Sequence, residues 1–169
     1  MSKCTLCPVS EFAFRQVVYK GVLPCRFLFL GEAPGKTEDM TGSPFCGASG
    51  RLLDRIVPDE YLEDSAVANV VRCRPTDGYG MRNRIPSWRE QETCSQERLL
   101  PWMRKEAKPD ALILLGRVAQ EVVARRDELL FLPKLCLPHP AYLLRRGSIA
   151  EEMDVCRNEL ISFRKRVLK

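Results

Sequence analysis

The chain has 169 residues, enough for one domain with a sizeable core, and 45% of them are hydrophobic, which is ordinary for a globular protein. A net charge of +5 does not by itself indicate nucleic-acid binding, the N-terminus lacks a signal peptide's apolar segment, and the apolar runs are too short to span a bilayer. We therefore expect a single soluble domain over 1–169 that is not exported and works in the reducing cytoplasm.

Strands and helices alternate along the chain. Short apolar runs predict strands at 26–30, 65–71, 111–115 and around 134–138. Helices are predicted at 49–56 and 117–124, and two capping boxes open helices at Ser87 with Glu90 and at Ser148 with Glu151. This order is typical of a parallel sheet of four strands with helices on both faces.

Polar and glycine residues follow several of these strands. Gly31, Asn69, Gly116 and His139 all fall at or just after a predicted strand end. Because ligands bind parallel sheets at the carboxyl ends of their strands, we expect one site to gather these residues.

The first strand runs into "LFLGEAPGKT", which almost matches a phosphate-binding loop. The pattern requires a glycine where this chain has Leu30, and the carboxylates of Glu32, Glu38 and Asp39 oppose a phosphate. Glycines nevertheless let a backbone approach a ligand closely, and Phe45 is the one aromatic ring among them. The loop therefore favours a flat ligand over a nucleotide phosphate.

Eight cysteines in a chain without a secretion signal suggest a metal rather than disulfides. Cys4 and Cys7 form a C-x-x-C pair, and the separation of Cys73 from Cys94 suits a [4Fe–4S] cluster better than a zinc ribbon. The alternative is that Cys73 and Cys94 are unrelated core residues. The remaining four are expected to be packing residues: Cys25, Cys46, Cys136 and Cys156.

Two single polar residues have two interpretations each. Asn69 lies in an apolar strand, so its buried amide pairs with either the backbone or a ligand edge. His139, the only histidine, lies between prolines and is either a turn residue or a functional group. The basic stretches at 80–86 and 143–147 are either a solvated surface or phosphate contacts.

Together these segments resemble the family 4 uracil-DNA glycosylases, the iron–sulfur branch of that superfamily. The resemblance is carried by "CTLCP", "GEAPGKTEDMTGSPFCGASGRLLDRI", "NVVRCRP" with "NRIPS", "ALILLGRVA" and "HPAYLLR". It implies a three-layer α/β/α sandwich and a DNA repair enzyme that hydrolyses the N-glycosidic bond of uracil, leaving an abasic site. It also implies a [4Fe–4S] cluster on four cysteines: Cys4, Cys7, Cys73 and Cys94.

The resemblance also implies roles for residues of the base pocket. Phe45 would stack on a flipped uracil, Asn69 would read its polar edge, and Glu38 would crowd the position of the thymine methyl group. Glu32 and the backbone of Ala33 would face the sugar and the attacking water. His139 would stabilise the negative charge that develops on uracil O2, by donating a hydrogen bond.

The expected partner is uracil-containing DNA, single- or double-stranded, bound by a monomer. Phosphate contacts are expected from Arg82, Arg84, Arg145 and Arg146. Leu144, or else Leu143, would fill the gap that the flipped base leaves.

One departure from the family concerns Asn83, which matches a further pocket position. The loop between Cys73 and Asn83 is longer here, and the extra residues are expected to bulge outward at "DGYG". Three alternatives to the enzyme stay open at this point: a non-catalytic nucleic-acid-binding module of the same fold with a structural metal cluster, a zinc-binding nucleic-acid protein, and an electron-transfer protein, which would need no base pocket.

Overall fold

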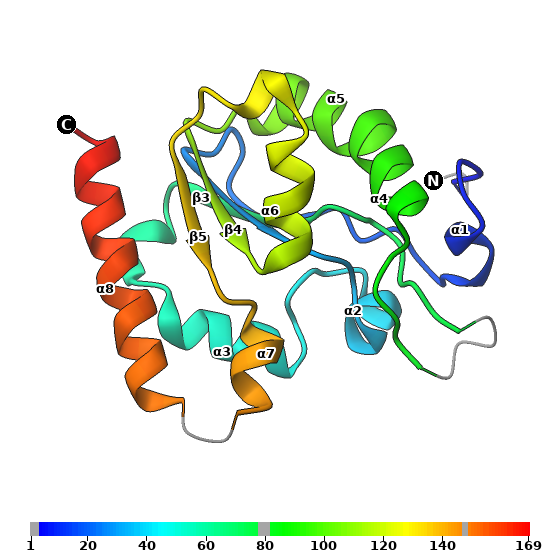
Figure 1. The fold of residues 1–169 in the computed structure, drawn as a ribbon, viewed down its shortest axis with the longest axis horizontal. Coiled ribbons are helices and arrows are strands. Elements are labelled where there is room, and N and C mark those ends of the chain that lie inside the picture. Colours follow the sequence, from blue (N-terminus) through cyan, green and yellow to red (C-terminus); the bar gives the residue numbers. More distant parts are fainter. Residues whose placement is uncertain (1–3, 78–81, 147–148) are drawn as a thin grey trace.

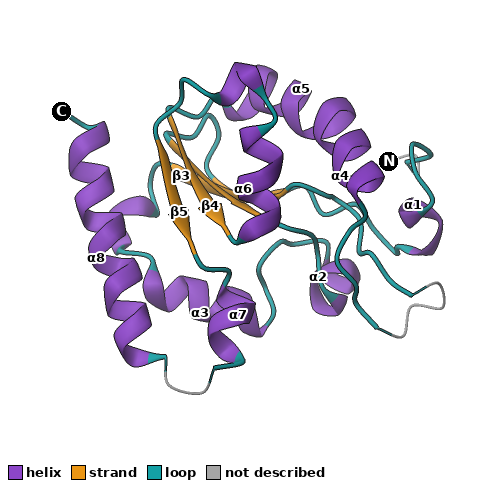
Figure 2. Cartoon of the chain, viewed as in Figure 1, coloured by secondary structure: helices purple, strands orange, loops and turns teal. Residues whose placement is uncertain are grey.

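The computed structural model describes residues 4–77, 82–146 and 149–169. One sheet contains all five of its described strands: β1 (Tyr19–Gly21), β2 (Phe27–Gly31), β3 (Ser65–Asn69), β4 (Ala111–Leu115) and β5 (Lys134–Leu137). Their order in the sheet is β1-β3-β2-β4-β5. All pairs are parallel except β1 with β3. The architecture is thus the expected α/β sheet with helices on both faces (Figures 1 and 2).

The prediction of four strands was wrong by one. Strand β1 pairs antiparallel with β3, with Tyr19 opposite Ala68 and Gly21 opposite Ala66. All three residues of β1 are exposed, and the segment is too short to show an apolar alternation. Its pairing depends on the free edge of β3, which is a tertiary property.

The helices divide between the two faces of the sheet (Figure 1). The first group is α3 (Ala48–Ile56), α7 (Pro140–Leu144) and α8 (Ala150–Val167). The second group is α6 (Arg117–Ala124) and a long helical segment. This segment consists of α4 (Trp88–Cys94), η2 (Ser95–Leu99), α5 (Leu100–Trp102) and η3 (Met103–Ala107). Short helices complete the chain: α1 (Val9–Phe12), α2 (Lys36–Thr41), η1 (Asp59–Tyr61) and η4 (Asp127–Leu129).

One predicted capping box is confirmed. The Ser87 hydroxyl accepts the Glu90 N–H at 3.3 Å, and the Glu90 carboxylate accepts the Ser87 N–H at 2.7 Å. The second box involves Ser148, which lies outside the described residues. Helix α8 begins at Ala150 with Ile149 as its N-cap, without a side-chain cap.

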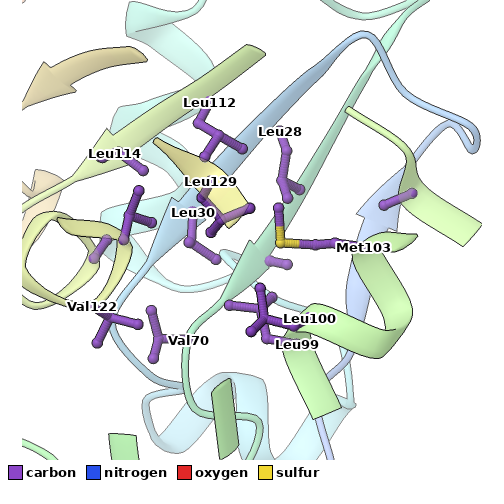
Figure 3. Close-up of a cluster of buried hydrophobic side chains, with 14 of the residues drawn as sticks. Leu28, Leu30, Val70, Leu99, Leu100, Met103, Leu112, Leu114, Val122 and Leu129 are labelled. Carbon is purple, nitrogen blue, oxygen red and sulfur yellow. The ribbon is translucent and has the colours of Figure 1, made fainter. Parts of the chain in front are cut away.

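Strand β2 supplies both cores of the protein because its side chains alternate between the faces of the sheet. Leu28 and Leu30 pack toward α5 and α6, as Figure 3 shows, and Phe27 and Phe29 pack toward α3 and α8. Each side chain of this size contributes about 1.5–3 kcal/mol when it is fully buried. The rigid β2 therefore fixes the position of the loop that follows Gly31.

No helix in these described ranges is both long and apolar enough to cross a membrane.

Candidate active site

A cavity of about 370 Å³ opens where β2 and β3 end and where the segment after β5 begins. The sheet order changes direction here, since β3 and β4 lie on opposite sides of β2. The cavity is lined by every residue predicted to contact the base, the sugar or the attacking water: Glu32, Ala33, Glu38, Phe45, Asn69, Asn83 and His139.

Glycine makes room for the aromatic wall of this cavity. A Cβ on Gly31 would stand 2.5 Å from Phe45 Cζ and 2.6 Å from Asn69 Oδ1, so no side chain fits there. Phe45 has a left-handed backbone (φ 52°), and a Cβ on Gly50 would lie 1.7 Å from the Phe45 carbonyl oxygen. The glycines after β2 thus leave room for the Phe45 ring in the cavity wall.

The Glu38 side chain bridges two parts of the glycine-rich loop that follows β2. Its two carboxylate oxygens accept the backbone N–H of Gly47 at 2.8 Å and that of Gly35 at 3.1 Å. Carboxylate hydrogen bonds to backbone amides are charge-assisted and strong. Glu38 therefore joins the two ends of the glycine loop and lends the cavity wall a negative charge.

Asn69 lies at the end of β3, paired with Gly31 across the sheet, and is 2% exposed. Its Oδ1 is buried and accepts no hydrogen bond in the described structure. An unpaired buried acceptor costs about 1–3 kcal/mol, so native proteins rarely keep one without a reason. A ligand that donates an N–H to Asn69 would remove this cost.

His139 caps helix α7, and its Nδ1 accepts the Ala141 N–H at 3.1 Å. Burial, and secondarily the charge of Arg145, lower the pKa of His139 to about 4. The ring is therefore neutral near pH 7 and carries its proton on Nε2, the nitrogen that remains free to donate. Its centroid lies 6.0 Å from that of Phe45, so the two rings bound the same space.

Glu32 follows β2 directly, and its backbone carbonyl accepts the Val71 N–H at 3.0 Å. Burial raises the pKa of its carboxyl group, while the charges of Arg117 and Arg145 act in the opposite direction. A half-buried carboxylate among arginines stabilises a positive charge that develops nearby.

Asn83 keeps its place in the cavity wall despite the longer loop. The loop doubles back as a hairpin, with Thr76 opposite Asn83 and the Arg84 N–H donated to the Pro75 carbonyl at 3.1 Å. The predicted bulge lies outside the described residues except for Asp77. Sequence reasoning missed the buried Arg74, whose Nε donates to Asn83 Oδ1 at 2.6 Å. No sequence signal separates Arg74 from other arginines of this chain.

The predicted DNA-contacting residues differ in availability. Arg82, Arg145 and Arg146 are exposed, and Arg145 lines the cavity. The Arg84 guanidinium is already engaged by both Glu90 oxygens at 2.7 Å and by the Thr76 carbonyl at 2.8 Å. Its charge is therefore largely neutralised, and it fastens the hairpin to α4.

The two adjacent leucines of α7 differ in their exposure to solvent. Leu143 is 2% exposed and packs in the core, whereas Leu144 is 41% exposed. Of the two, only Leu144 is available to DNA.

The four predicted metal ligands come together beside α1 and α4. The pKa of the Cys73 thiol is raised to about 12, by burial first and then by the nearby Cys94, Cys4 and Cys7. Within the described ranges, however, no three His, Cys, Asp or Glu side chains form a group that could hold a single metal ion. A cubane cluster separates its ligands more widely than one ion does.

The surroundings of these thiols fit a negatively charged cluster. Arg98 Nη2 donates to Cys4 Sγ at 3.7 Å, and the Arg72 backbone N–H donates to Cys94 Sγ at 3.4 Å. Hydrogen bonds to sulfur are a normal feature of iron–sulfur sites. The four thiols, of which Cys73 is buried and the other three are half-buried, and the arginines beside them therefore fit a [4Fe–4S] cluster.

The other cysteines follow the prediction with one exception. Cys25 and Cys156 are buried, and Cys46 is half-buried against the Thr41 hydroxyl at 3.1 Å. Cys136 was expected to pack but is exposed. It lies on β5 at the edge of the sheet, where the intervening side chains of the strand turn away from the core.

The sequence is similar to that of known proteins over most of its length. The model of the uracil DNA glycosylase superfamily matches residues 20–161. A type-4 uracil-DNA glycosylase of Thermotoga maritima is 34% identical over 163 residues, which cover 88% of this chain and 81% of that protein. The corresponding protein of Pyrobaculum aerophilum is 31% identical, covering 91% and 86%, and that of Archaeoglobus fulgidus is 28% identical, covering 89% and 83%.

Proposed function

This chain belongs to the uracil DNA glycosylase superfamily, and from that premise we propose that it is a DNA repair enzyme that hydrolyses the N-glycosidic bond of uracil in DNA. The products are free uracil and an abasic site. The observation that carries the proposal is the buried, unpartnered Asn69 Oδ1 in the cavity wall. Uracil offers it the N3–H, whereas cytosine presents an acceptor at the same position.

Catalysis starts with extrusion of the base from the stack, which costs a few kcal/mol. Phe45 supplies the stacking face that the base loses, and Asn69 accepts its N3–H. Glu38 fills the side of the pocket where thymine would carry a methyl group. These contacts offset the cost of extrusion for uracil more than for other bases.

Bond cleavage then separates charge. The bond between N1 and C1′ breaks with its electron pair on uracil, so negative charge grows on the base and positive charge on the sugar. His139 donates from Nε2 to O2, and the Glu32 carboxylate faces the sugar cation. Water adds to C1′ beside Glu32 and the Ala33 backbone, and its proton is released.

A uracil-containing oligonucleotide treated with the protein and then with alkali tests the proposal. We expect strand cleavage at uracil, but not at cytosine or thymine. Asn69→Ala should abolish release, while the melting temperature changes little, because the Asn69 Oδ1 accepts no hydrogen bond from any of the described residues. Binding without release by the wild-type protein would instead support the non-catalytic module.

We further propose that Cys4, Cys7, Cys73 and Cys94 hold a [4Fe–4S] cluster. When bound, the cluster cross-links the N-terminal segment to the loop after β3 and to α4; the hydrolysis itself uses none of its chemistry. Anaerobically purified protein should contain about four irons per chain, and Cys4→Ala should lower the melting temperature. Stoichiometric zinc without iron would contradict the proposal. We also propose that the protein works in a reducing compartment, where the cysteine ligands stay free of disulfides.

DNA contact is proposed for Arg82, Arg145 and Arg146, with Leu144 as the wedge beside the extruded base. The support is their exposure, the position of Arg145 in the cavity wall and that of Leu144 next to it on α7. Arg84 is also proposed to contact a phosphate, for which its guanidinium would have to leave Glu90. We also propose that a monomer acts, on single or double strands.

A further inference from the structure

Arg74 has a buried cationic side chain for which the proposed chemistry has no use. It follows Cys73 directly and is only 5% exposed. Its Nε donates to Asn83 Oδ1 at 2.6 Å, and this is the one hydrogen bond of its guanidinium within the described residues. Burying a guanidinium costs free energy, so the contact with Asn83 calls for a function.

The oxygen of the Asn83 side chain is held by Arg74, whereas its amide nitrogen remains available to a ligand. The hairpin fixes the backbone of Asn83 opposite Thr76, and the side chain is exposed in the cavity wall. Asn83 Nδ2 lies 3.6 Å from the position that a Cβ on Gly35 would take. The amide nitrogen therefore faces the glycine loop, on the side where Glu38 closes it.

A guanidinium donates hydrogen bonds and cannot accept them. Arg74 therefore stabilises only the rotamer in which Asn83 turns its oxygen inward and its N–H₂ group toward the cavity. A carboxamide without such a partner could flip and present the oxygen instead. The cavity wall then presents an acceptor at Asn69 Oδ1 and donors at Asn83 Nδ2 and His139 Nε2.

We propose that Arg74 is a positioning residue that orients Asn83 to donate a hydrogen bond to an oxygen of the extruded nucleotide. The inference rests on the proposed function. The acceptor is either a carbonyl oxygen of the base or an oxygen of the sugar–phosphate backbone.

The decisive variant is Asn83→Asp. Aspartate keeps the acceptor for Arg74, so the hairpin and the melting temperature should be preserved, but it has no N–H to donate. We expect kcat/KM for uracil release to fall about tenfold or more, on the scale of one hydrogen bond. Full activity of Asn83→Asp would overturn the proposal.

Arg74 itself is tested by a double-mutant cycle. Arg74→Met and Asn83→Ala should each lower kcat/KM by a similar factor, and the double variant should lose little more than either, because both remove the same interaction. Arg74→Lys should restore part of the loss. Arg104→Met is the matched control, since Arg104 pairs with Glu128 on the surface, and it should be unaffected. Additive losses would overturn the coupling between Arg74 and Asn83.

Two binding measurements identify the acceptor. If Asn83 contacts the base, Asn83→Asp should weaken inhibition by free uracil; if it contacts the backbone, the variant should weaken binding to abasic DNA. Either result supports the proposal, and unchanged binding of both ligands would overturn it. Failure of the wild-type protein to release uracil would sink the proposed function, whereas an active wild type with unaffected variants would sink this inference alone.

Discussion

At the scale of single residues, His139 illustrates how local geometry sets chemistry. As the N-cap of α7 it commits Nδ1 to the Ala141 N–H, which leaves the proton on Nε2. The low pKa of His139 keeps the ring neutral near pH 7, so the role proposed for it is to donate a hydrogen bond without transferring a proton. Neither the prolines around it nor its being the only histidine establishes this tautomer.

Replacing His139 should slow the chemical step more than binding. Removing one preorganised donor costs about 10²–10³ in rate, and we expect His139→Ala to release uracil at least about a hundredfold more slowly in single-turnover experiments. Affinity for DNA with an uncleavable uracil analogue should change far less, because this interaction strengthens in the transition state. A near-normal single-turnover rate would make His139 a turn residue only.

The titration of His139 can be followed directly, since an NMR spectrum of this chain contains one imidazole. We expect a midpoint near pH 4 instead of about 6.5. Because the folded pKa is depressed, the neutral ring's contribution to stability is complete above about pH 6.5 and is lost as the pH falls through about 4. A midpoint near 6.5 would show that the ring is solvated and free of the Ala141 contact.

At the scale of elements, the glycines that follow the strands allow neighbouring segments to approach the carboxyl ends of the sheet closely. Gly116 follows β4 directly and has a positive φ of 83°, and a Cβ there would stand 2.8 Å from the Cβ of His139. The segment after β5 can therefore approach β4 closely enough to bring His139 over the cavity. The hairpin between Cys73 and Asn83 keeps Asn83 in the cavity wall, because its two arms are bonded to each other.

Gly116→Ala should consequently impair activity through His139. The added methyl group strains the left-handed backbone and pushes the histidine away from the cavity. We expect a loss of uracil release comparable to that of His139→Ala, together with a lower melting temperature. A protein with both Gly116→Ala and His139→Ala should be little less active than either single variant. If the two losses of activity multiply instead, Gly116→Ala does not act through His139.

At the scale of the whole molecule, the hydrophobic cores position the site and the net charge attracts the polyanion. The two cores on either side of β2 hold the strand ends in place, and the net charge of +5 attracts a polyanion without specifying a sequence. Arg145 in the cavity wall and the exposed Arg146 next to it place part of this charge where the base is proposed to enter.

DNA affinity should therefore fall steeply with salt. Changing Arg145 and Arg146 together to Gln should lower the slope of log K against log[salt] by about 1 for each phosphate that the variant no longer neutralises. The matched control is Arg104→Gln, remote from the cavity, which should leave the slope unchanged. Equal slopes for all three proteins would place the phosphate-binding side chains elsewhere.

The sequence by itself determined the elements whose local patterns are strong. The apolar runs of β2, β3 and β4, the capping box at Ser87 and the glycine loop after β2 are encoded within a few residues of each other. The family motifs likewise singled out the residues proposed to bind the base, and these residues line one cavity.

Only the tertiary structure decided the features that depend on distant neighbours. Strand β1 exists because β3 has a free edge, Cys136 is exposed because β5 is an edge strand, and Arg84 is engaged because α4 presents Glu90. The orientation of Asn83 likewise depends on Arg74, nine positions earlier in the chain. Sequence patterns report the period of a single segment, whereas pairing, burial and side-chain orientation depend on which segments the fold brings together.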